Sequence, residues 1–86
     1  MIRYTVTFDP KAKKALLEAP KSDRDRISIA IELLRENPMP PKALKLKGRD
    51  GYRIRVGKFR IIYTFNGSEL LILVLDIGPR RDIYLR

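Results

Sequence analysis

The chain of 86 residues contains no cysteine and no histidine. The absence of cysteine excludes disulfide bonds, thiolate nucleophiles and cysteine-ligated zinc or iron–sulfur sites. The absence of histidine excludes an imidazole general base, a histidine metal ligand and every serine-type catalytic triad. Any chemistry must therefore come from charged side chains, hydroxyl groups and the backbone.

Long apolar runs are also absent. The longest, residues 70–75, ends at Asp76 and is far shorter than the roughly 20 residues that cross a bilayer. The opening MIRYTVTFDP alternates apolar with polar residues and carries Arg3, unlike the apolar centre of a signal peptide. We therefore expect a cytoplasmic protein without a targeting segment, built as a single domain over residues 1–86.

Positive charge is what the chain has in excess: 19 lysines and arginines against 10 acidic residues, a formal charge of +9. Residues 42–60 hold eight basic residues and only Asp50 as an acid, a net charge of +7. Such runs are commonly a solvated face. In so small a domain, however, the excess favours an anionic partner, and nucleic acid is the leading candidate.

The first half of the chain is predicted to form a strand and two helices. Alternation over residues 2–8 indicates a half-buried strand. Asp9 followed by Pro10 is typical of an N-cap and the first position of a helix. A second helix is predicted from an N-cap at Ser22 to the break at Asn37. Its expected buried stripe is Ile27, Ala30, Ile31 and Leu34, widened by Ile29 and Leu33.

The second half is predicted to form two hairpins. After a proline- and lysine-rich connection over residues 38–49, strands are expected at 52–56, 59–65 and 68–77, the last covered on both faces. The resulting fold class is α+β, with the order β-α-α-β-β-β. A helical hairpin is expected to pack on one face of a largely antiparallel four-stranded sheet.

A two-residue turn at Gly57-Lys58 sets the register of the first hairpin. It places Arg55 opposite Arg60 and puts both, with Arg53, on the face away from the core. Like charges directly opposite one another are unfavourable by up to about 1 kcal/mol. A bound phosphate chain would explain the cluster because guanidinium groups bind phosphate bidentately. The alternative is three arginines spread into solvent.

A two-residue turn at Asn66-Gly67 would extend this face with apolar residues, placing Leu73 beside Arg60 and Leu71 beside Ile62. Arg80 and Arg81 follow the last predicted strand and could rim the face. Tyr84 has two interpretations, a core aromatic or a platform on which a base stacks.

The segment GYRIRVGKFRIIY and the later DIGPRRDIY resemble the RelE toxins of the RelE/ParE superfamily. The similarity covers nearly the whole chain because the element order and the opening strand and helix also fit. The resemblance implies a type II toxin that cuts messenger RNA in the ribosomal A site. In that chemistry the RNA 2′-hydroxyl attacks the neighbouring phosphodiester, and neither a metal nor another cofactor takes part. The resemblance also implies a cognate antitoxin, which we expect to be acidic.

Carried over by position, Arg60 resembles the arginine that stabilises phosphate charge, and Arg80 the arginine that contacts the scissile region and protonates the leaving oxygen. Tyr84 resembles the tyrosine that stacks on a nucleotide. Arg53 and Arg55 stand where better-known members carry lysine. Arginine is a poor general base, so the base is left open. Residues expected to contact RNA or the ribosome are Lys42, Lys45, Lys47, Arg49, Lys58 and Arg81.

Two other functions stay open at this point. A ParE-like toxin would inhibit DNA gyrase by binding, but such relatives tend to lack the arginine and tyrosine set. A non-enzymatic RNA- or ribosome-binding module would show salt-dependent affinity without cleavage.

Overall fold

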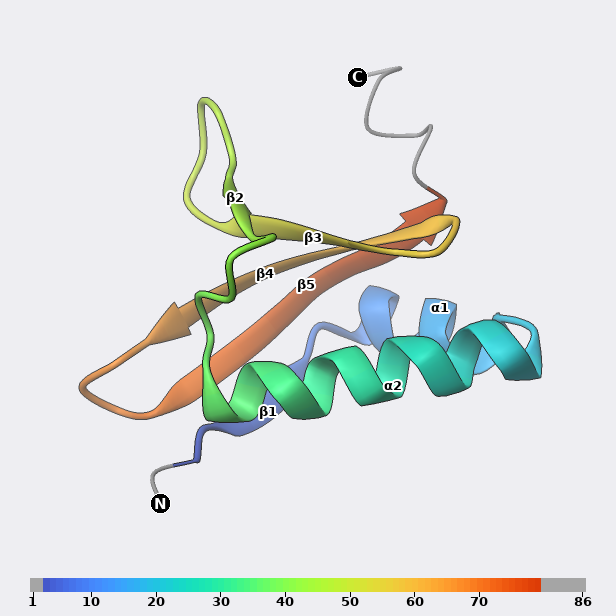
Figure 1. Cartoon of the computed structure of the whole chain (residues 1–86), viewed down its shortest axis with the longest axis horizontal. Coiled ribbons are helices and arrows are strands. Elements are labelled where there is room, and N and C mark those ends of the chain that lie inside the picture. The colour runs from blue at the N-terminus through green and yellow to red at the C-terminus, as the bar shows by residue number, and fades with distance from the viewer. Residues whose placement is uncertain (1–2, 80–86) are drawn as a thin grey trace.

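The structure is a computed structural model and describes residues 3–79. Figure 1 shows α1 and α2 on the same face of a twisted sheet, as the sequence predicted. The sheet face turned away from the helices is called the outer face below. The elements are β1 (Thr5–Phe8), α1 (Pro10–Glu18), α2 (Lys21–Glu36), β2 (Leu44–Lys45), β3 (Tyr52–Val56), β4 (Phe59–Asn66) and β5 (Leu71–Pro79).

The start of α1 is confirmed and the predicted cap of α2 is wrong. The Asp9 carboxylate accepts a hydrogen bond from the backbone N–H of Lys11 at 2.9 Å, and Pro10 is the first helical residue. The second helix begins at Lys21, directly after Pro20, and has no side-chain cap. Ser22 therefore lies inside the first turn, because the Pro20 carbonyl already accepts the N–H of Arg24 at 2.8 Å.

The buried stripe of α2 is narrower than the sequence suggested. Ile27, Ile31 and Leu34 are buried, as predicted, whereas Ala30 is half-buried. Ile29 and Leu33 are 62% and 63% exposed, so their assignment to the stripe is wrong. The helix lies along the sheet with one face only, and these two side chains point away from that contact. Neither helix within residues 3–79 is long and apolar enough to cross a membrane.

The sheet has five strands rather than four, in the order β1-β5-β4-β3-β2. The additional strand β2 lies in the connection that was predicted to be irregular, and its two residues pair with Tyr52 and Arg53. It is too short to show a periodic pattern. All neighbouring strands are antiparallel except β1 and β5, which pair in parallel. This pairing places β5 in the interior of the sheet, between β1 and β4.

The register of the first hairpin is confirmed. Arg55 lies opposite Arg60, and Tyr52 opposite Tyr63. Gly57 has φ 58°, while Lys58 is not among the residues with positive φ, as a type II′ turn requires. A local turn with a fixed length was therefore sufficient to place the three arginines on one face.

The register that was predicted for the second hairpin is wrong. The turn covers residues 67–70, so the last strand begins at Leu71, and Leu73 pairs with Thr64 rather than Arg60. The Asn66 side-chain oxygen accepts the N–H groups of both Ser68 and Glu69, at 2.9 and 3.0 Å, and stabilises this longer turn. A β-bulge at Ile62/Tyr63 then shifts the pairing further.

The expected coverage of the last strand on both faces is also wrong. Leu71 and Leu73 are each 38% exposed, whereas Ile72 and Val74 between the sheet and the helices are fully buried. The helices therefore shield one face of β5, and the outer face keeps an apolar section at the β4–β5 turn end.

Candidate phosphate-binding site on the outer face

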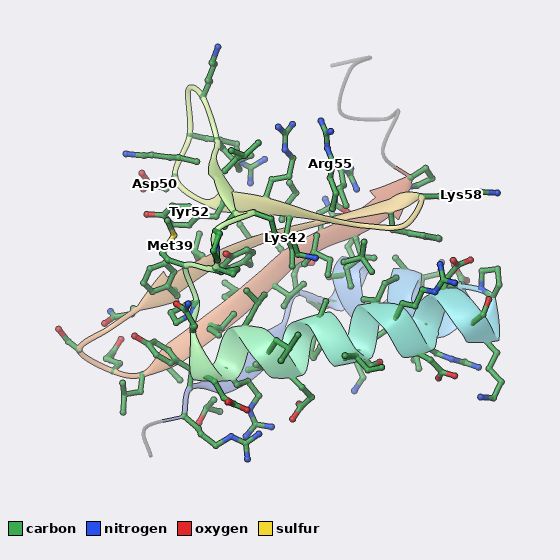
Figure 2. All side chains as sticks on the ribbon, viewed as in Figure 1. Met39, Lys42, Asp50, Tyr52, Arg55 and Lys58 are labelled. Carbon is green, nitrogen blue, oxygen red and sulfur yellow. The ribbon has the colours of Figure 1, made fainter. Side chains whose placement is uncertain are left out.

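Three arginines from β3 and β4 lie on the outer face. The confirmed pairing of Arg55 with Arg60 sets them directly across from each other, and Arg53 is two residues along β3 on the same side. Figure 2 shows Arg55 pointing away from the helices. Arg55 is exposed, Arg53 is half-buried and Arg60 is only 3% exposed. The cluster therefore extends from solvent into the body of the protein.

Arg60 is held by a carboxylate that the sequence interpretation did not assign to it. Its Nη2 lies 2.9 Å from Oδ2 of Asp76, and the two side chains are 4% and 19% exposed. A buried guanidinium is costly unless it is paired and hydrogen-bonded. Asp76 was missed because the predicted register placed Leu73 at this position. The available signal was an acidic residue inside the predicted last strand, directly after the apolar run 70–75.

The opposite amino group of Arg60 has no such partner. Nη1 is buried and forms no hydrogen bond with the residues that the structure describes. The guanidinium lies across Gly78, which pairs with Arg60 between β4 and β5. A Cβ atom at Gly78 would stand 2.5 Å from Nη1, so only glycine leaves room for this orientation. Buried donors without a partner are uncommon in native proteins, and a bound anion is one way in which such a donor is satisfied.

Arg53 contributes a second buried donor. It lies between Leu44 of β2 and Ile62 of β4, and this apolar flank accounts for its partial burial. Its Nε finds no hydrogen-bond partner among residues 3–79. Two of the three clustered guanidinium groups thus carry buried N–H donors that have no hydrogen-bond partner among residues 3–79.

The other predicted RNA-binding residues within the described part of the chain are exposed and lie around this sheet, not within the arginine cluster. Lys42 reaches back to β3, where its Nζ donates to the Arg55 carbonyl at 3.4 Å. Lys58 lies in the β3–β4 turn, at the opposite end of β3 from Asp50 (Figure 2). The exposed set is Lys42, Lys45, Lys47, Arg49 and Lys58.

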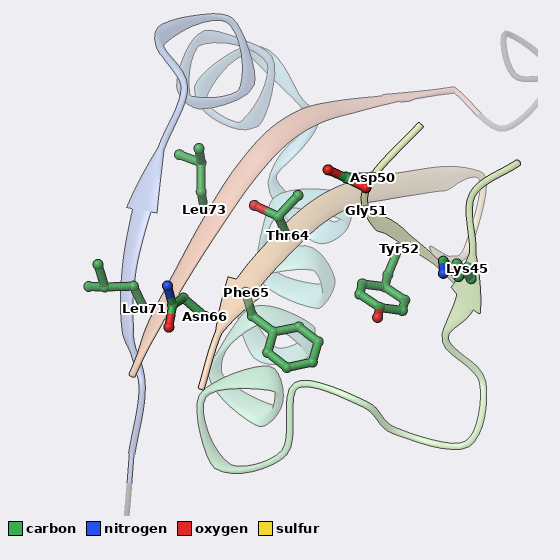
Figure 3. Close-up of a pocket in the computed structure, with 9 residues that line it drawn as sticks. All are labelled: Lys45, Asp50, Gly51, Tyr52, Thr64, Phe65, Asn66, Leu71 and Leu73. Atoms are coloured by element: carbon green, nitrogen blue, oxygen red, sulfur yellow. The ribbon is translucent and has the colours of Figure 1, made fainter. Parts of the chain in front are cut away.

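A hollow of about 550 Å³ lies at the other end of the sheet and is distinct from the arginine cluster. Figure 3 shows its lining, in which the rings of Tyr52 and Phe65 lie close together, with centroids 5.4 Å apart. Thr64 also lines it and lies about 13 Å along β4 from Arg60, at about 3.3 Å per residue. The predicted mixed floor is therefore apolar around Leu73 and cationic around Arg60, and the two parts adjoin where Arg53 pairs with Ile62.

Arg80, Arg81 and Tyr84, which the sequence singled out, lie outside the described residues. Within residues 3–79, no group of three or more acidic side chains is arranged to hold a metal ion.

Comparisons with known proteins agree with this architecture. The family profile described as "ParE toxin of type II toxin-antitoxin system, parDE" matches residues 6–84. A curated relative from Methanocaldococcus jannaschii, assigned as a RelE-type toxin, is 31% identical over 87 residues, covering 96% of this chain and 97% of the relative.

Solved structures match as well. The RelE–RelB complex of Pyrococcus horikoshii contains a chain with 31% identity and a TM-score of 0.77, covering 91% of this chain and 96% of that one. The intact Escherichia coli RelBE complex matches with a TM-score of 0.78 at 23% identity, over 88% of this chain and 95% of that chain, which supports the fold alone. The chain therefore belongs to the RelE family, within the RelE/ParE toxins of type II toxin–antitoxin systems.

Proposed function

We propose that this toxin is an endoribonuclease that cuts messenger RNA in the A site of the ribosome. The observation that carries the proposal is the Arg60 guanidinium, buried on the outer face with one amino group paired and the other without a partner among residues 3–79. Such a preorganised cation is suited to the charge that develops on a phosphate in the transition state. In other enzymes one such donor contributes about 3–4 kcal/mol.

The proposed step is an internal transesterification. The RNA 2′-oxygen bonds to the adjacent phosphorus, the bond from phosphorus to the 5′-oxygen breaks, and the products are a 2′,3′-cyclic phosphate and a 5′-hydroxyl. A general base, whose identity is left open, takes the proton of the 2′-hydroxyl, and the 5′-oxygen takes up one proton, so the step balances without water. Arg60 contacts the phosphate, while Arg53 and Arg55 add positive charge. By family resemblance, Arg80 supplies the proton to the leaving oxygen and Tyr84 stacks on a nucleotide.

The chain has no histidine and few other groups that could act as a general base, which indicates why such an enzyme would need the ribosome. At 3% exposure the guanidinium meets an RNA phosphate only after neighbouring side chains move. The exposed basic residues of the 42–60 segment would bind ribosomal RNA, and the decoding site would hold the messenger strand in line for attack. Orientation of this kind contributes several kcal/mol to catalysis.

We also propose a cognate antitoxin, since relatives from P. horikoshii and E. coli were solved as complexes with RelB. Charge complementarity with the 42–60 segment requires an acidic partner and raises the association rate. A partner that is extended when unbound could wrap so small a domain.

The second candidate function is gyrase inhibition, which the match to the ParE profile favours. A toeprinting assay on a translated messenger separates the functions. Ribonuclease activity gives new 5′-hydroxyl ends at ribosome positions and none on naked RNA. Gyrase-dependent DNA damage without new RNA ends would establish the ParE-like function. If the protein binds the ribosome but produces neither RNA ends nor DNA damage, it is a non-enzymatic binding module.

A further inference from the structure

We propose that Asp76 and Gly78 are positioning residues that together set the orientation of the Arg60 guanidinium for phosphate contact. This inference rests on the proposed nuclease function and assigns roles to two residues of β5 that do not themselves touch RNA. Three independent features of the structure carry it: the ion pair, the space over the glycine and the β-bulge.

Asp76 fixes one end of the guanidinium. Its Oδ2 accepts from Nη2 at 2.9 Å in a contact that is largely shielded from water. The guanidinium is planar and rigid, so fixing Nη2 also fixes the direction in which the N–H groups of Nη1 point. Because Nη1 has no partner among residues 3–79, the ion pair leaves these donors uncommitted.

Gly78 supplies the space in which the guanidinium lies. A Cβ atom there would be 2.5 Å from Nη1, 3.3 Å from Cζ and 3.5 Å from Nη2. Gly78 is not among the glycines with positive φ, so its backbone conformation is open to any residue. A side chain at this position would therefore displace the guanidinium of the arginine and leave the chain path unchanged.

The β-bulge brings both residues to the outer face. Thr64 pairs with Leu73, and continuing that register would pair Arg60 with Ile77 and turn Asp76 toward the helices. The irregularity between Ile62 and Tyr63 instead pairs Arg60 with Gly78. Ile77 is thereby buried in the core at 3% exposure, and Asp76 reaches Arg60. Bulges commonly re-aim side chains next to active sites.

The test uses the full chain with Asp76→Asn or Gly78→Ala. The first keeps a side-chain oxygen but removes its charge, and the second adds one methyl group against Nη1. Gly67→Ala is the matched control, because a Cβ there meets only the Tyr4 hydroxyl, at an ordinary 3.5 Å, and Gly67 also lacks positive φ. Folding is checked by circular dichroism, and kcat and KM are measured on messenger RNA bound to ribosomes.

We expect each variant to lower kcat by about 10- to 100-fold, with KM within about twofold, since a misplacement of about 1 Å can cost 100-fold. The exposed basic residues that are proposed to bind the ribosome are unchanged, which is why KM should hold. Gly67→Ala should match the parent protein. In an Arg60→Ala background, Gly78→Ala should have no further effect, because the residue acts only through that guanidinium.

Other results overturn the inference. If the parent protein cleaves and both folded variants cleave within threefold of it, the positioning role is wrong while the nuclease function stands. The same holds if Gly78→Ala slows a variant that already lacks Arg60. If the parent protein itself cleaves nothing on the ribosome, the proposed function fails and the positioning role fails with it.

Discussion

The hydroxyl of Tyr63 donates a hydrogen bond of 2.7 Å to the backbone carbonyl of Pro38. Tyr63 is fully buried in the middle of β4, and Pro38 follows the end of α2, so this bond joins the helical layer to the sheet. Burial, and then the neighbouring Tyr52, raise the pKa of Tyr63 from 10.0 to about 12. The phenol therefore stays protonated in the folded protein at pH values where the unfolded chain loses the proton.

This difference predicts a loss of stability at alkaline pH. Above pH 10 the unfolded state binds fewer protons than the native state, so the free energy of unfolding falls as pH rises, until the native phenol itself ionises near pH 12. The protonated Tyr63 phenol makes its full contribution to the free energy of unfolding below pH 10. This contribution amounts to about 2–3 kcal/mol, at 1.36 kcal/mol per pKa unit. Urea unfolding between pH 9 and 12 should show this loss in the parent protein but not in Tyr63→Phe. Equal pH slopes for the two proteins would contradict it.

The two faces of α2 should differ sharply in their sensitivity to truncation. Ile27→Ala or Ile31→Ala should lower the free energy of unfolding by about 2–5 kcal/mol, because both side chains are buried and leave cavities. Ile29→Ala and Leu33→Ala, on the exposed face, should change it by no more than about 0.5 kcal/mol. Denaturant midpoints of the four variants are the measurement, and a large loss at Ile29 would show that this face is covered.

Neutralising the exposed basic residues from the end of β2 to Arg49 should weaken ribosome binding in a salt-dependent way. With Lys45, Lys47 and Arg49 changed to glutamine, the slope of log affinity against log salt should become shallower by about 0.7–0.9 for each phosphate that is no longer neutralised. The matched control changes Lys11, Lys13 and Lys14 of α1, which are equally exposed but lie on the helical side. If both triple variants show the same change in slope, binding depends on net charge and not on this surface.

Conservative replacement of the central arginine should abolish toxicity. Lysine at position 60 could still pair with Asp76 but cannot hold that carboxylate and a phosphate through two rigid, parallel amino groups. Arg60→Lys should therefore permit growth at an expression level where the parent protein arrests it, with near-parent stability. Arg60→Ala is harder to interpret because it leaves the largely buried Asp76 carboxylate without its cation and so also lowers stability. Growth arrest by Arg60→Lys would remove Arg60 from the proposed site.

An acidic antitoxin should reduce hydrogen exchange in the basic segment. We expect slower exchange over residues 42–60, where the charge of +7 is concentrated, and over residues 78–86, which hold Arg80 and Tyr84. The measurement compares the toxin alone with the toxin bound to its neutralising partner, using α1 as the internal reference. Neutralised toxicity without slower exchange in either segment would rule out this mode of inhibition.

Local chemistry alone determined much of this protein. The missing cysteine and histidine restricted the chemistry, and the charge excess pointed to an anionic partner. The turn at Gly57-Lys58 placed Arg53, Arg55 and Arg60 on one face, because a two-residue turn leaves one register and side chains alternate with period two. The motifs around these arginines also carried the resemblance to RelE toxins that the comparisons confirmed.

Tertiary structure decided what surrounds Arg60. Its pairing with Asp76 and its position over Gly78 depend on a turn lengthened by the Asn66 side chain and on a bulge two residues away from Arg60. The apolar pattern of the strands is compatible with more than one register, with or without the longer turn and the bulge. Packing of the whole sheet on the helices determines which register forms. Tertiary packing also determined the exposure of Ile29 and Leu33. Their spacing places them beside the buried stripe of α2, but only the contact with the sheet determines how wide that stripe is.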